Sequence, residues 1–164
     1  MANLFLVNFN SYSGYDTDDC SAYHRMANSV QMYGAGLKSD FTGHDIFFQN
    51  DLSIFGRGGD QYQALVPGYF NYMAGCTLLA ANDGEQLIHE VCPNASDWPK
   101  IIGTSVLSPT GNVTVCGVPI AEWQARIPGV LANVSAAPIP ASLSASAIVQ
   151  MARDTLAGKA AARS

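Results

Sequence analysis

Charged residues are scarce in this chain, which has 8 Lys plus Arg and 13 Asp plus Glu among 164 residues. Charged side chains make up 13% of the sequence, against about 25% in ordinary soluble domains. Covering such a surface removes few ions from water, and burying uncharged polar groups costs far less than burying ions. Charge depletion is also typical of the cores of protein interfaces. We therefore expect much of this surface to contact other proteins.

A basic patch is also missing. The net charge is −5, and the three lysines, Lys38, Lys100 and Lys159, are far apart. Sequence-specific nucleic acid is therefore not an expected partner, because binding to phosphates needs clustered cations. The expected partners are copies of this chain and other assembly proteins.

Long apolar runs are absent too. The first one, Leu4 to Val7, is too short for a membrane span and has no basic flank. We expect neither a signal peptide nor a membrane span. The expected location is a virion or a cytoplasmic assembly.

Cysteine is infrequent, with only four residues: Cys20, Cys76, Cys92 and Cys116. Their wide spacing and mostly apolar surroundings predict buried thiols rather than a disulfide framework. The expected state is no cofactor and no metal. The alternative is a zinc site of Cys20, His24, His89 and Cys92, which has suitable ligand types but no recognised spacing.

Helical periodicity occurs near both ends. Tyr23, Met26, Val30 and Tyr33 recur at steps of three or four over residues 16–33, with aspartates in the first turn, and this predicts an N-terminal helix. Residues 142–156 show the same period and predict a C-terminal amphipathic helix. Prolines between residues 119 and 140 predict an extended arm before that second helix.

Short apolar runs separated by turn residues fill the middle of the chain. They predict three tandem hairpins, over residues 45–55, 76–91 and 101–120. The expected fold is α+β, with a mainly antiparallel sandwich or barrel-like body. We expect residues 1–127 to form one β-rich domain, and residues 128–164 to form the arm and C-terminal helix.

Three classes of function are compatible with these patterns. The leading hypothesis is a structural subunit of a large assembly, with a virus or phage particle component such as a capsid, decoration or tail protein as its main form. Low charge gives a free monomer little colloidal repulsion, which is harmless inside an assembly. The residues expected at the interface are Tyr62, Tyr69, Phe70, Tyr72, Leu143, Ile148 and Met151.

The second hypothesis is a carbohydrate- or protein-binding β-sandwich, with Trp98, Trp123 and Tyr69 as ligand-binding residues, because aromatic faces stack on sugars. The third is a small hydrolase-type enzyme that uses a Cys/His pair or the carboxylates Asp16, Asp18, Asp19, Asp45 and Asp51. The sequence has no G-x-S-x-G motif. We assign no catalytic residue and regard an enzyme as less favoured than a structural protein.

Overall fold

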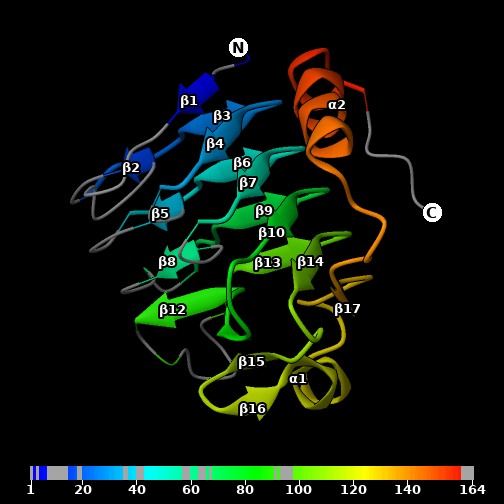
Figure 1. Cartoon of the computed structure of the whole chain (residues 1–164). Coiled ribbons are helices and arrows are strands. Elements are labelled where there is room, and N and C mark those ends of the chain that lie inside the picture. The colour runs from blue at the N-terminus through cyan, green and yellow to red at the C-terminus, as the bar shows by residue number, and fades with distance from the viewer. Residues whose placement is uncertain are drawn as a thin grey trace.

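Figure 1 shows the fold in a computed structural model of the chain. The structure describes residues 2, 4–6, 15–17, 20–34, 37–39, 43–56, 60–62, 66, 68–90, 92 and 98–159. Most strands are only three residues long, and they stack in order of sequence from β1 near the N-terminus.

The strands form three parallel sheets. Sheet 1 contains β1 (Leu4–Leu6), β4 (Val30–Met32), β7 (Leu52–Ile54), β10 (Thr77–Leu79), β14 (Ser105–Ser108) and β17 (Ser135–Pro138). Sheet 2 contains β2 (Tyr15–Thr17), β5 (Leu37–Ser39), β8 (Asp60–Tyr62) and β12 (Ile88–Glu90). Sheet 3 contains β3 (Arg25–Ala27), β6 (Phe47–Gln49), β9 (Tyr72–Ala74) and β13 (Lys100–Ile102).

Within these three sheets, strands that follow one another along the chain belong to different sheets, and each strand pairs with its equivalent one coil later. The chain is therefore a parallel β-solenoid. A smaller sheet of β11 (Gly84–Glu85), β15 (Val113–Val115) and β16 (Val118–Pro119) contains the antiparallel pair β15–β16. The two helices within the described residues are α1 (Ile120–Arg126) and α2 (Ala145–Leu156).

The predicted mainly antiparallel fold is wrong, since the sheets are mostly parallel. The segments predicted as hairpin arms do contain strands, but the strands in sheets 1 to 3 pair across coils rather than with their neighbours in sequence. The antiparallel pair β15–β16 lies within one predicted arm, residues 113–120, and does not join the two predicted arms. The predicted N-terminal helix over residues 16–33 is also wrong, because this segment contains β3, β4 and the end of β2. The helix-like spacing combines positions with different roles. Tyr23 and Tyr33 have left-handed backbone conformations, Met26 points inward, and Val30 packs beneath α2.

Residues in the left-handed region turn the chain from sheet 3 into sheet 1. Asn28, Asn50, Gly75, Gly103 and Asn133 occupy equivalent positions, with φ between 52° and 65°. Asn and Gly adopt this conformation most easily. The backbone N–H of each of the first four bonds to a carbonyl of the following coil, over 2.8 to 3.0 Å. We call these five residues the corner column.

Two apolar clusters stabilise the solenoid. Inward side chains such as Met26, Phe48, Met73 and Ile101 fill its interior. The second cluster lies on the outer face of sheet 1, beneath α2, and is built around Val30, Leu52, Ile54 and Leu79. Burial of each such aliphatic side chain contributes about 1.5 to 3 kcal/mol.

The predicted C-terminal helix is present as α2. Ser144 caps it, because its Oγ accepts a hydrogen bond from the Ala147 N–H over 3.2 Å. The preceding segment, predicted to be an extended arm, contains the short helix α1 and the strand β17, which pairs with β14. In the part of the chain that the structure describes, neither helix has the length and hydrophobicity needed to cross a membrane.

Candidate binding surface

The outer face of sheet 3 carries a column of aromatic and cationic side chains. Parallel pairing places Arg25, Phe47, Tyr72 and Lys100 in register on successive strands. The rings of Phe47 and Tyr72 stack at 4.5 Å between centroids, with planes 7° apart. We call these four residues the aromatic column.

The two cations flank this ring pair. Lys100 Nζ lies 5.6 Å from the centroid of Tyr72 and 4.3 Å from that of Phe70. The Arg25 guanidinium donates a hydrogen bond to Gln49 Oε1 on the next strand. Cation–aromatic contacts at exposed sites contribute about 0.5 to 1 kcal/mol each. These contacts hold the column in place while leaving it accessible.

The outer face of sheet 3 remains partly exposed to solvent. Phe47 is 38% exposed and Ile102 is 42% exposed. By contrast, α2 packs over β4 and β7 of sheet 1, and α1 packs against β15 and β16. Large apolar side chains grouped on an open sheet face are typical of interaction surfaces.

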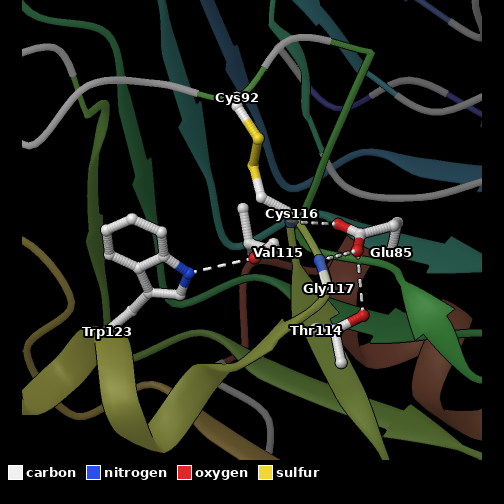
Figure 2. Close-up of a disulfide and its surroundings, with 7 residues drawn as sticks. All are labelled: Glu85, Cys92, Thr114, Val115, Cys116, Gly117 and Trp123. Carbon is white, nitrogen blue, oxygen red and sulfur yellow. Dashed lines mark hydrogen bonds between the residues drawn. A yellow bond between two sulfur atoms is a disulfide. The ribbon is translucent and has the colours of Figure 1, made fainter.

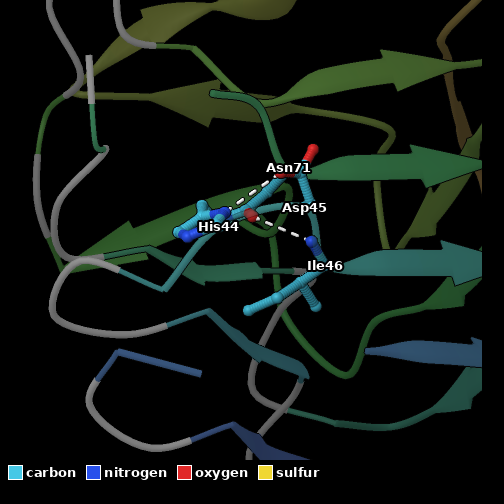
Figure 3. Close-up of polar contacts among 4 residues, drawn as sticks. All are labelled: His44, Asp45, Ile46 and Asn71. Carbon is cyan, nitrogen blue, oxygen red and sulfur yellow. Dashed lines mark hydrogen bonds and ion pairs between the residues drawn. The ribbon is translucent and has the colours of Figure 1, made fainter. Parts of the chain in front are cut away.

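Histidine and tyrosine side chains extend this surface beyond the start of the strands. The His44 ring lies 4.4 Å from that of Tyr69 and 5.4 Å from that of Tyr23, between centroids. His44 Nδ1 is 3.0 Å from Asp45 Oδ2 (Figure 3). Next to them, the Ile46 N–H donates to Asn71 Oδ1 over 3.2 Å.

A His–Asp pair can orient an imidazole for proton transfer. Here the described partners of the His44 side chain are Asp45 and two tyrosine rings, and no Ser, Thr or Cys hydroxyl or thiol among the described residues bonds to it. The arrangement therefore fits a packed corner better than a nucleophilic site.

Of the other candidate carboxylates, only Asp51 has a side chain that the structure describes. Asp16 lies in β2 with its side chain outside the description, and Asp18 and Asp19 lie outside the described residues altogether. Asp51 is buried at the inner side of a corner, where its Oδ1 accepts a hydrogen bond from the Ser29 N–H over 2.8 Å. Burial raises the pKa of Asp51 to about 7.

The cysteines do not behave as one group. Cys92 and Cys116 form a disulfide with Cα atoms 5.7 Å apart (Figure 2), so the prediction of thiols is wrong for these two. Folding brings them together although 24 positions separate them in sequence. Cys76 is a buried thiol as expected, whereas Cys20 is exposed. Burial, followed by the nearby Asp51 charge, raises the pKa of Cys76 to about 12.

The alternative zinc site is not formed by the described side chains. Cys92 is oxidised, and the side chain of His89 in β12 is outside the description. His24 is exposed. Within the described residues, no cluster of three or more His, Cys, Asp and Glu could hold a metal ion.

Glu85 holds the turn that carries the disulfide. Its two carboxylate oxygens accept hydrogen bonds from the backbone N–H groups of Cys116 and Gly117, both over 2.8 Å (Figure 2). The Thr114 hydroxyl donates a third bond, over 3.0 Å. The carboxylate is thereby used as a structural acceptor.

The three residues predicted to bind a ligand differ in how much of their side chains solvent can reach. Trp98 is 1% exposed and packs at 4.8 Å from Trp123. Trp123 is partly buried, and its indole N–H donates to the Val115 carbonyl over 3.0 Å. Only Tyr69, 43% exposed, has a ring open to solvent.

The predicted interface residues fall into two groups. Tyr69, Phe70 and Tyr72 lie at or near the outer face of sheet 3, while the side chain of Tyr62 is outside the description. The other three are partly buried against their own chain, in the cluster beneath α2: Leu143, Ile148 and Met151.

Sequence reasoning missed Arg25, Phe47 and Lys100 as surface partners of Tyr72. The signal that could have found them is the recurrence of an aromatic or cationic residue three positions before each of the first four members of the corner column. No protein-family model, curated protein or solved structure matches this chain.

Proposed function

We propose that this chain is a structural subunit of a larger protein assembly, with a virus or phage particle component, such as a capsid, decoration or tail protein, as the leading candidate. The observation that supports this function best is the open outer face of sheet 3 with its aromatic column. Rings and aliphatic side chains there lose unfavourable contact with water when a partner covers them.

The charge on this face favours a particular kind of contact. Within the aromatic column, Arg25 and Lys100 flank the ring pair, whereas the whole chain has a net charge of −5. Pairing two copies of the same face would bring cations together. Contact with a different face of a second copy avoids that repulsion. Head-to-tail contacts of this kind build rings or extended arrays.

The disulfide bears on the setting of such an assembly. Disulfides persist mainly in oxidising environments, so Cys92–Cys116 favours a mature particle over a reduced cytoplasm. The scarcity of charge fits the same proposal, because covering uncharged polar groups costs little.

The test is the native mass measured by light scattering over a range of protein concentrations. We expect the wild-type chain to form species larger than a monomer, in amounts that rise with concentration. The double substitution Phe47→Ser with Ile102→Ser should leave the chain monomeric. The matched control is Val149→Ser on α2, because Val149 is 48% exposed but belongs to another face.

Circular dichroism would check that each variant keeps its strands. A wild-type chain that stays monomeric up to about 1 mM would contradict the proposal, since contacts weaker than this do not sustain an assembly without other subunits. Equal association of the double variant and the wild type would instead exclude sheet 3 as the contact surface.

A further inference from the structure

A groove of about 530 Å³ lies where the chain turns from sheet 3 into sheet 1. Its polar lining consists of Asn28, Gln49, Asn50, Thr77 and Ser105. The other described lining residues are small or apolar, and none of the described lining residues is charged. Gly158, just after α2, closes one side.

The corner column explains why the hollow exists. Its first, second and last members are Asn28, Asn50 and Asn133, but Gly75 and Gly103 stand between them. All five need positive φ, which both Asn and Gly provide. Glycine at the two middle coils therefore removes side chains without changing the backbone. Because coils are spaced by about 4.8 Å, the gap between Asn50 and Asn133 is about 14 Å long.

Side-chain amides are held in place at one end of the gap. Asn50 Nδ2 donates to Asn28 Oδ1 over 2.7 Å. The Gln49 carbonyl oxygen accepts from Arg25, which leaves the Gln49 NH₂ group as a donor. An ordered amide offers both donors and acceptors to a ligand without further loss of conformational entropy.

Thr77 adds a hydroxyl to this polar lining. The residue is only 9% exposed, yet it lines the groove. The equivalent positions in the two preceding coils are Val30 and Leu52, which pack beneath α2. At this position of the coil, a hydroxyl therefore replaces an apolar side chain where the groove is present.

We propose that this groove binds an uncharged carbohydrate. A sugar hydroxyl both donates and accepts, and so matches the amides of Asn50 and Gln49 and the hydroxyls of Thr77 and Ser105. A phosphate or carboxylate ligand would need a cation in the lining, because transfer of an unpaired charge out of water is costly. A wholly apolar ligand would displace water from these amides and hydroxyls without replacing its hydrogen bonds.

The decisive variant refills the gap with the residue that other coils use. Gly75 has φ +65°, and a Cβ built there meets nothing within 4 Å, so Gly75→Asn extends the row of amides with little strain. The matched control is Gly68→Asn. Gly68 has φ +88°, and a Cβ built there meets nothing within 4 Å, but this glycine precedes β9 whereas Gly75 follows it. Thr77→Val then removes the hydroxyl while keeping its shape.

Binding is measured by calorimetry with short neutral oligosaccharides of glucose, galactose, mannose and N-acetylglucosamine. We expect at least one of them to bind the wild type and Gly68→Asn equally. Gly75→Asn should lose detectable binding, and Thr77→Val should bind about tenfold more weakly, the effect of one lost hydrogen bond.

Three results would overturn the proposal. The first is a folded wild type that binds none of these sugars at about 10 mM, a concentration that reveals even weak complexes. The second is equal binding by Gly75→Asn and the wild type, which would place the sugar elsewhere. The third is binding of an uncharged Ser- and Asn-rich peptide in place of every sugar, which would assign the groove to another class of ligand.

Discussion

The buried carboxyl group of Asp51 should make the stability of the solenoid depend on pH. Asp51 follows the corner residue Asn50 and points inward, with 4% of its surface exposed. Its Oδ1 accepts from the Ser29 N–H, but its Oδ2 has no hydrogen-bond partner among the described residues. Burial raises the pKa of Asp51 from 3.8 to about 7, against the lowering effect of hydrogen bonds from backbone N–H groups.

The direction of the effect follows from linkage. A carboxyl group with a raised pKa in the folded state favours folding when it is protonated. Its contribution is fully present below pH 3.8, the unfolded value, and is lost as the pH rises to about 7. Each pH unit of difference corresponds to about 1.4 kcal/mol, so the upper limit of the loss is about 4 kcal/mol. That is a large part of the 5 to 15 kcal/mol typical of folded domains.

Asp51→Asn keeps the shape of the side chain and removes the titrating group. We expect the free energy of unfolding of the wild type to fall between pH 4 and about 7 relative to Asp51→Asn, which leaves the variant the more stable of the two above pH 7. Urea unfolding followed by tryptophan fluorescence measures both proteins at each pH. Asp154→Asn is the control, because that carboxylate is on the exposed side of α2 and bonds to Lys159.

The comparison between proteins matters more than the slope of either one, since other carboxylates and histidines titrate in the same range. If the difference between wild type and Asp51→Asn stays constant from pH 4 to pH 8, Asp51 does not titrate as its burial implies. The reasoning from burial to pKa would then be refuted.

Two further predictions concern covalent and backbone constraints. Reducing the Cys92–Cys116 disulfide, or replacing Cys116 with Ser, should lower the free energy of unfolding by about 3 kcal/mol for this loop length. Urea unfolding midpoints measured with and without reductant test this, and unchanged midpoints would contradict it. Gly111→Ala should destabilise the chain more than Gly75→Ala. A Cβ at Gly111 would lie 2.7 Å from the backbone nitrogen of Pro138, whereas one at Gly75 meets nothing within 4 Å. Thermal unfolding of the two variants side by side tests this, and equal losses of stability would show that the contact relaxes without cost.

Local sequence patterns located many of the strands but not their partners. The segments 45–48, 52–55 and 76–80 were predicted as strands, and β6, β7 and β10 lie within or overlap them. These short apolar runs reflect burial in a sheet, and burial alone does not distinguish parallel from antiparallel pairing. Pairing was assigned from short turns, which favour hairpins only where the chain reverses direction.

The information that specifies the solenoid is an internal repeat. Met26-Ala27-Asn28, Phe48-Gln49-Asn50 and Met73-Ala74-Gly75 each place an inward apolar residue two positions before a left-handed corner. Such self-similarity is the recognised signal of stacked coils. It is difficult to see here because the interval between corners, 22 positions for the first pair, lengthens with each coil.

Other features could not be predicted from local patterns. The disulfide depends on β15 and the segment near Cys92 meeting in space. The C-terminal helix was recognisable from its period, but nothing in its own residues indicates that it packs over β4 and β7. The groove can be recognised from the sequence only by comparing the same position across five coils, and that comparison requires the strand register to be known.

The placement of α2 has a consequence for how the molecule comes apart. Stacked-repeat proteins unfold stepwise from their ends when each unit contacts only its neighbours. Here a helix late in the chain packs on β4 and β7, near the opposite end of the stack, and shares an apolar cluster with Leu79 and Leu107 from later coils. Fraying of the early coils therefore exposes α2 as well, so the helix works as a clasp that joins distant coils into one cooperative unit.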